Sequence, residues 1–144
     1  MTIKDMPGHL IRRLQQHSTL VFTTRMREAG HDITSVQFAA MDALTSQPGI
    51  DQATVAALIA YDRATIGGVI DRLESKGLVE RTVSEQDRRA RVVRLTDRGR
   101  QLYTQLLPLV DAVQEEILAP LPNANRDNFI ETMQLLIAGI ERHD

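Results

Sequence analysis

The chain has 144 residues, of which 42% are hydrophobic and only 3% aromatic, and its formal net charge at pH 7 is −2. The absence of cysteine excludes disulfides, thiol redox sensing and thiolate metal sites. No apolar run reaches the roughly 18 residues of a membrane span, and charges interrupt every apolar run near the N-terminus. We therefore expect a cytoplasmic protein with no signal peptide and no membrane partner.

The first two predicted elements are helices. Apolar residues recur at spacings of three and four from Leu10 to Val21, which predicts a helix over residues 9–29 with a broad apolar face. Gly30 is placed to end it. Thr34 then begins a capping box, which predicts the start of a second helix.

Two shorter helices follow. Asp51 is placed to cap a helix over residues 52–60, and Asp62 to cap a second helix over residues 62–76. Such a pair is a candidate helix-turn-helix, whose second helix enters the major groove of DNA and presents its N-terminal residues to base edges and phosphates. An ordinary helical hairpin has the same pattern, so the pair alone leaves both interpretations open.

The pair supplies seven candidate DNA-contacting residues, which are Thr54, Arg63, Ala64, Thr65, Gly67, Gly68 and Arg72. Two adjacent glycines in a helix interior each cost about 1 kcal/mol relative to alanine. Close approach of the helix backbone to DNA, or to another helix, would offset that cost.

A β-hairpin comes next. Residues 79–83 alternate as a half-buried strand, residues 91–95 are a second strand, and the polar residues 84–90 join them. Seven arginines and three acidic residues lie between positions 81 and 100. Arginine suits a narrow minor groove because it is always charged and weakly hydrated. A solvated loop is the plainer interpretation, but a helix-turn-helix followed by an arginine-tipped hairpin favours a winged helix-turn-helix over residues 31–96 that binds DNA through Arg88, Arg89 and Arg91.

The terminal segments carry more apolar surface than this unit can cover. Thr96 is placed to cap a long helix that contains Pro108, which usually kinks a helix, and a last helix is predicted from Asn123 or Asn125. Residues 1–30 and 97–144 are therefore expected to form a helical dimerisation region, because a broad unpaired apolar face marks an interface. A self-contained monomeric bundle is the alternative.

A resemblance adds to these patterns. The motif that carries it is Ser75-Lys76-Gly77-Leu78-Val79-Glu80-Arg81 followed by Asp87-Arg88-Arg89-Ala90-Arg91-Val92-Val93-Arg94-Leu95-Thr96-Asp97-Arg98-Gly99. This motif resembles the signature of the MarR (multiple antibiotic resistance regulator) family, and the resemblance spans essentially the whole chain. It implies a mainly α-helical winged helix-turn-helix with a small β-hairpin, in a homodimer whose terminal helices interlock. It also implies that Arg89 enters the minor groove and that Asp87 orients the wing through a salt bridge, for which Arg72 is one candidate partner. The pair Gly67-Gly68 departs from the polar or basic residues of many relatives.

A cluster of basic residues lies on the first helix. It consists of His9, Arg12, Arg13 and His17, and His17 also falls on the apolar stripe, where a polar group needs a partner. An interface or core histidine is one interpretation, and a pocket for an anionic aromatic ligand is the other. The family resemblance implies a ligand crevice between the dimer helices and the DNA-binding lobe, to which Phe38 and Met41 would add apolar surface. The four scattered histidines do not favour a metal site, and we expect no cofactor.

No catalytic motif is present, since the sequence has no phosphate-binding glycine loop and no nucleophile elbow. We therefore expect a ligand-responsive transcriptional regulator and not an enzyme. It would be a repressor that binds a palindromic operator as a homodimer and is released by a small aromatic acid. The alternative is an architectural or protein-interaction module that uses the winged fold without reading sequence.

Overall fold

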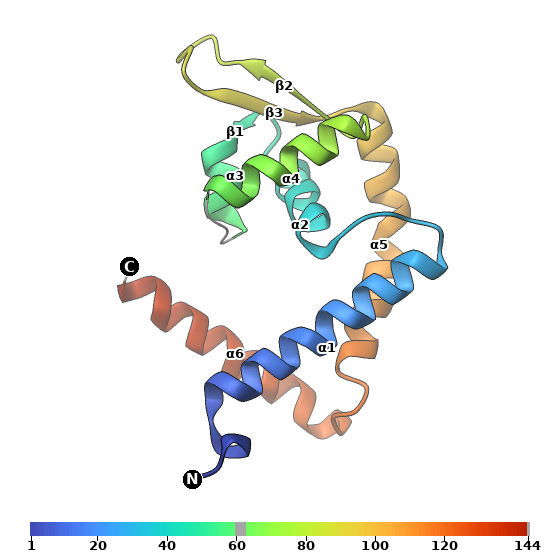
Figure 1. Cartoon of the computed structure of the whole chain (residues 1–144), viewed down its shortest axis with the longest axis vertical. Coiled ribbons are helices and arrows are strands. Elements are labelled where there is room, and N and C mark those ends of the chain that lie inside the picture. Colours follow the sequence, from blue (N-terminus) through green and yellow to red (C-terminus); the bar gives the residue numbers. More distant parts are fainter. Residues whose placement is uncertain (60–62, 144) are drawn as a thin grey trace.

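The structure of the chain, a computed structural model, describes residues 1–59 and 63–143, except for the side chain of Arg63. Its elements in chain order are η1 (Ile3–Asp5), α1 (Pro7–Glu28), α2 (Ser35–Ser46), β1 (Ile50–Asp51), α3 (Gln52–Leu58), α4 (Arg63–Ser75), β2 (Val79–Val83), β3 (Arg91–Leu95), α5 (Asp97–Ile117) and α6 (Asn123–His143). Figure 1 shows α2, α3, α4 and the sheet gathered into a lobe at one end, with α1 and α6 at the other. The predicted fold class, mainly α-helical with a small winged sheet, is confirmed.

Local signals set the helix ends as expected. The side chains of Thr34, Asp51 and Thr96 accept hydrogen bonds from backbone N–H groups in the first turns of α2, α3 and α5. Gly30 and Gly77 follow α1 and α4 with φ of 81° and 74°, a left-handed conformation that glycine adopts without strain. The helix cap expected at Asp62 lies outside the described residues.

The sheet contains one strand that the sequence pattern did not predict. The strand order is β1-β3-β2, all antiparallel, and the expected hairpin is β2 with β3, in which Arg81 lies opposite Val93. The additional strand β1 pairs Ile50 with Val93. It has two residues, which is too short for an alternating pattern to be recognised.

The helix α4 is held between the core and the sheet. Its residues Ile66, Val69, Ile70 and Leu73 recur at helical spacing and are all buried. At its C-terminal end the Lys76 ammonium donates a hydrogen bond to Gln37 Oε1, 3.1 Å away, and another to the carbonyl oxygen of Asp32. These contacts leave the opposite side of α4, which includes Ala64 and Thr65, facing outward.

The core crosses the boundary expected between the two regions. Val21, Phe22 and Met26 from α1 and Leu106, Val110 and Val113 from α5 belong to the same buried cluster as the side chains of α2 and α4. The α5 helix continues through Pro108 and links both ends of the molecule (Figure 1). The lobe expected to bind DNA and the helices expected to form the dimer region therefore share one core.

An ion pair braces α1 against α5. Both nitrogens Nε and Nη2 of Arg25 donate to the Glu116 carboxylate, at 2.5 and 2.6 Å. This contact and a second one to Glu28 raise the pKa of Arg25, and the hydrogen bonds from Arg25 lower the pKa of Glu116. The ring nitrogen Nε2 of His17 lies 2.9 Å from the carbonyl oxygen of Ile117, so Nε2 carries the proton and donates it.

A charge-removing substitution tests this brace. Glu116→Gln should lower stability at neutral pH, because the lowered pKa of Glu116 means that the folded state favours its ionised form. Stability from such a group is present above its unfolded pKa and is lost as pH falls through the folded pKa. The difference between wild type and variant in urea unfolding should therefore close as pH falls below 4.5. The control is Glu141→Gln, and a difference that stays constant down to low pH would contradict the brace.

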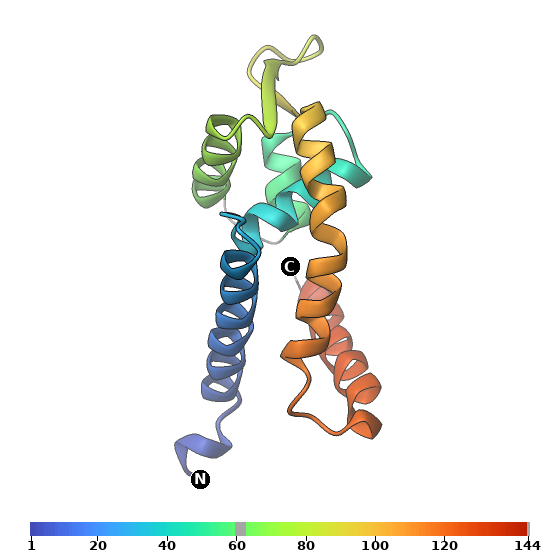
Figure 2. The same cartoon turned by 90° about the vertical axis from the view of Figure 1, so that its right-hand side faces the viewer.

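The last helix buries no residue in the single chain. Its large apolar side chains Met133, Leu136, Ile137 and Ile140 are all exposed, as are Leu10, Ile11 and Leu14 on α1. Figure 1 shows α6 leading away from the end of α5, and Figure 2 shows α6 apart from the N-terminal half of α1. No helix in the described part of the chain combines the length and apolar character needed to cross a membrane.

Candidate nucleic-acid interface

The outward side of α4 carries most of the predicted helix contacts. Ala64 and Thr65 are exposed in its first turns, and Gly67 and Gly68 are partly exposed one turn further on. Arg72 is exposed towards the C-terminal end of the helix. The predicted contact of Arg63 depends on a side chain outside the described ones.

The glycine pair is not required by packing within the chain. A Cβ added at Gly67 would lie 3.5 Å from Gln52 Nε2, and one added at Gly68 would lie 3.5 Å from Arg72 Nη1. Both distances are ordinary van der Waals contacts with flexible side chains. Because Gly67 and Gly68 have no side chains, another molecule can approach the backbone of α4 closely at these two residues.

Thr54 differs from the other candidates because it lies on α3 and is half-buried. Its backbone N–H donates to Asp51 Oδ1 at 2.7 Å, which caps the helix. The cap places Thr54 in the first turn of α3.

The tip of the wing is held by its own polar groups. The Asp87 carboxylate accepts a hydrogen bond from the Arg89 backbone N–H at 3.0 Å and lies 3.7 Å from Arg89 Nε. The Ser84 hydroxyl accepts from the backbone N–H groups of Gln86 and Asp87. The ion-pair partner of Asp87 in the described part of the chain is therefore Arg89, and not Arg72, the partner considered from the sequence.

Arg89 extends from the tip, where 96% of its side chain is exposed. Arg88 and Arg91 are exposed beside it. A concave surface of about 410 Å³ separates the wing from the helices, and its lining includes Gln52, Arg81 and Arg89. The lining joins the wing to α3 and to Ile66 of α4, and its charged residues are three arginines and two aspartates.

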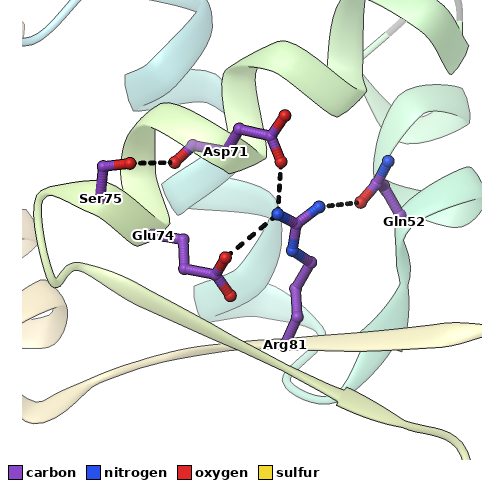
Figure 3. Close-up of polar contacts among 5 residues, drawn as sticks. All are labelled: Gln52, Asp71, Glu74, Ser75 and Arg81. Atoms are coloured by element: carbon purple, nitrogen blue, oxygen red, sulfur yellow. Dashed lines mark hydrogen bonds and ion pairs between the residues drawn. The ribbon is translucent and has the colours of Figure 1, made fainter.

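Arg81 is a functional candidate that the sequence interpretation missed. Figure 3 shows its guanidinium between α4 and α3, where Nη1 donates to Gln52 Oε1 at 3.2 Å and Nη2 donates to Asp71 and, at 3.1 Å, to Glu74. The sequence did contain one indication of this role. Arg81 lies on the same face of the predicted strand as the buried Val79, where an apolar residue is expected. Strand alternation places residues 79 and 81 on the same side of β2.

Comparisons with known proteins now decide the family. Residues 31–90 match the model of the MarR family. The transcriptional regulator HosA of Escherichia coli O157:H7 is 31% identical over 138 residues, which cover 95% of this chain and 98% of HosA. The chain belongs to the MarR family. It is therefore a transcriptional regulator, a class of protein that is not enzymatic.

Two solved structures of MarR-family proteins are similar over nearly the whole chain. The PcaV regulator of Streptomyces coelicolor, solved with its natural ligand, is 33% identical with a TM-score of 0.86 and covers 96% of both chains. BpsR of Bordetella bronchiseptica, whose DNA binding is regulated by 6-hydroxynicotinic acid, is 27% identical with a TM-score of 0.86, and covers 94% of this chain and 96% of its own. The winged helix-turn-helix fold of this MarR-family chain is thus shown.

The residues predicted to bind an effector fall into separate groups in this MarR-family chain. On α1, Arg12 Nη2 lies 3.2 Å from His9 Nδ1, with Arg13 exposed nearby, while the ring of His17 is held by α5. On α2, Met41 is fully buried in the core. Phe38, also on α2, stacks on Tyr103 with ring centroids 5.6 Å apart. A cavity of about 560 Å³ is lined by Phe38 together with other residues of α2 and with Leu58 and Ile59, and not by the residues of α1.

Tyr103 joins α5 to α2 beside that aromatic contact. Its hydroxyl donates to Asp42 Oδ1 at 2.6 Å. This hydrogen bond, followed by partial burial, raises the pKa of Tyr103 to about 12. The hydroxyl therefore stays protonated at neutral pH and remains a donor, so the aromatic pair Phe38–Tyr103 is fixed between the two helices.

Proposed function

We propose that the protein is a homodimeric repressor that binds a palindromic operator and leaves it when a small aromatic acid binds. The observation that carries the proposal is the outward side of α4 beside a wing whose tip presents Arg89 almost fully exposed. Two such units related by a two-fold axis match two half-sites about one helical turn apart.

The DNA contacts divide by chemistry. The exposed part of α4 would enter the major groove, where Ala64 and Thr65 reach base edges and the glycine pair brings backbone close to the bases. The helix contacts that remain are Thr54, Arg63 and Arg72, and the wing contacts are Arg88, Arg89 and Arg91. Phosphate contacts would supply affinity. Because the outward side chains at the start of α4 are small and make few base contacts, more of the sequence preference would come from the shape of the DNA.

A second copy of this chain is the proposed partner of the exposed apolar residues on η1, α1 and α6. Apolar residues that lie on one side of α6 and are exposed in the single chain, among them Leu136 and Ile140, form a face of the kind that interfaces cover. Dimerisation would also place two recognition helices on one side of the assembly.

The effector is proposed to be an aromatic acid because BpsR responds to 6-hydroxynicotinic acid and PcaV binds a natural ligand. The cations of α1, Arg12 and Arg13, are exposed in the single chain, and a guanidinium has several donors with which to bind a carboxylate. The proposed site is completed by His9, His17, Phe38 and Met41. Such a ligand releases DNA only if it binds one arrangement of the two lobes more tightly than the other.

The test is selection of binding sites from random DNA, repeated with 6-hydroxynicotinic acid and a panel of benzoic acids. We expect an inverted repeat, with binding weakened by at least one acid. A titration with salt on the selected and shuffled duplexes separates the alternative, an architectural module. Equal affinities that fall together with salt would favour that module and reject a sequence-specific regulator.

Arg89→Ala tests the wing. It should weaken operator binding by more than about 1 kcal/mol and lower the dependence of log affinity on log salt by about one, because one exposed phosphate or groove contact is lost. Fluorescence anisotropy at several salt concentrations measures both quantities. Arg27→Ala, which removes an exposed arginine of α1, is the control, and unchanged affinity in Arg89→Ala would reject the wing assignment.

A further inference from the structure

We infer that Arg81 is a positioning residue that fixes α4, the wing strand β2 and α3 relative to one another, so that helix and wing reach DNA in register. This inference deepens the proposed function and rests on it. Arg81 would determine specificity without touching DNA, and the nearby wing arginines would contact DNA directly.

The place of Arg81 in β2 is the first argument. In the register of the hairpin it lies opposite the fully buried Val93, two residues after the buried Val79. Its side chain therefore leaves the strand on the side that packs against α4, and only 21% of it is exposed. An arginine at such a position has to be fully paired, because a partly buried charge without partners is costly.

The shape of the guanidinium is the second argument. One nitrogen, Nη2, bridges Asp71 and Glu74, which lie one turn apart on α4, while Nη1 donates to Gln52 at the start of α3 (Figure 3). A planar group with donors in fixed directions can join three elements at once, whereas a lysine ammonium reaches them as a single point charge. The relative position of the three elements thus depends on one side chain.

The same contact also orients Gln52. Because its Oε1 accepts from Arg81, its Nε2 is the end that lies over Gly67, 3.5 Å from the place of a Cβ there. Gly67 belongs to the outward part of α4. Arg81 therefore controls a donor beside the surface that is proposed to read DNA.

The charge balance separates Arg81 from a phosphate ligand. Two carboxylates surround its single positive charge, and they raise the pKa of Arg81 while its hydrogen bond lowers the pKa of Glu74. A cation already paired in this way releases no counterion when DNA binds. Arg89, by contrast, is almost fully exposed at the wing tip.

Two variants that break the contact from opposite sides test the inference. Arg81→Gln removes a positive charge, whereas the double variant Asp71→Asn with Glu74→Gln removes two negative charges and keeps Arg81. If Arg81 positions the elements, both should lower the ratio of operator affinity to shuffled-duplex affinity about tenfold, the size expected for lost charged hydrogen bonds. The salt dependence of Arg81→Gln should equal that of wild type, and Arg81→Lys should recover only part of the ratio.

The matched control is Arg94→Gln, which removes an exposed arginine from the neighbouring strand β3 and should leave the ratio unchanged. Loss of about one unit of salt slope in Arg81→Gln, with equal weakening on both duplexes, would make Arg81 a phosphate contact and overturn the inference. The inference would also be overturned if the ratio of operator affinity to shuffled-duplex affinity fell in one variant and rose in the other, because the ratio would then follow the charge alone.

If the selection from random DNA yields no preferred site, that outcome rejects the proposed function. The inference about Arg81 can still be tested by a measurement without DNA. Amide hydrogen exchange should rise in β2 and in the C-terminal half of α4 in both variants, and stay at the wild-type level in α2 and α5. Unchanged exchange in β2 and α4 would show that Arg81 does not hold these elements together.

Discussion

Replacing Gly99 with alanine should destabilise the protein by about 3 kcal/mol or more, although alanine is the better helix former by about 1 kcal/mol. Gly99 is buried in the first turn of α5, where an added Cβ would lie 2.0 Å from the carbonyl oxygen of Leu78. That oxygen also accepts a hydrogen bond from the Thr96 backbone at 3.0 Å. Backbone on both sides is therefore held in place, and the methyl group can be accommodated only by moving α5 away from the end of α4.

Equilibrium unfolding in urea at one fixed protein concentration measures this effect, since association would make the midpoint depend on concentration. The matched control is Gly8→Ala in the first turn of α1, where an added Cβ meets nothing within 4 Å. We expect Gly8→Ala to be neutral or slightly stabilising. Equal stability of Gly99→Ala and wild type would mean that α5 does not approach Leu78 this closely.

The double variant Leu136→Asp with Ile140→Asp should convert the proposed dimer into monomers. Both side chains are on α6 and are exposed in the single chain, at 59% and 54%, so the charges cost little in an isolated protomer. In the proposed interface they would be buried without partners. Sedimentation velocity should show the mass fall to that of one chain, and operator affinity should fall at least about 100-fold because the two half-sites are no longer bound together.

The matched control places the same substitutions two residues earlier, at Gln134 and Ala138, about 200° around the helix. Both positions are exposed, and the loss of helix propensity is similar. We expect this control to remain a dimer. A dimer that survives the Leu136/Ile140 substitutions would place the interface elsewhere, and dissociation of both variants would indicate that α6 itself had unfolded.

Structural features that depend only on residues close together in the sequence could be predicted from it. The caps at Thr34, Asp51 and Thr96 and the stop at Gly30 each involve residues within about one helical turn, so the residue types alone indicate them. The two strands of the wing follow from alternation for the same reason. The buried stripe of α4 was also readable, since its period is that of the helix.

Contacts between distant residues were not readable in this way. The partner of His17 is the carbonyl oxygen of Ile117, a hundred positions along the chain, and backbone carbonyls leave no mark in the residue types. The complete burial of Met41 and the strand β1 depend on how α2 and β3 meet the rest of the core. The contact of Asp87 with Arg89 is short-range, but the backbone turn that creates it was not specified by composition.

The sequence by itself determined the family, the order of helices and strands, and the exposed arginines of the wing, because these follow from local pattern and from the motif between Ser75 and Gly99. Only the tertiary structure decided which arginine packs against α4 and which is exposed at the wing tip. Arg81 and Arg89 are the same residue type in one basic segment. Strand alternation and the packing of α4 turn Arg81 inward onto Asp71 and Glu74, while the hairpin carries Arg89 beyond the reach of the core.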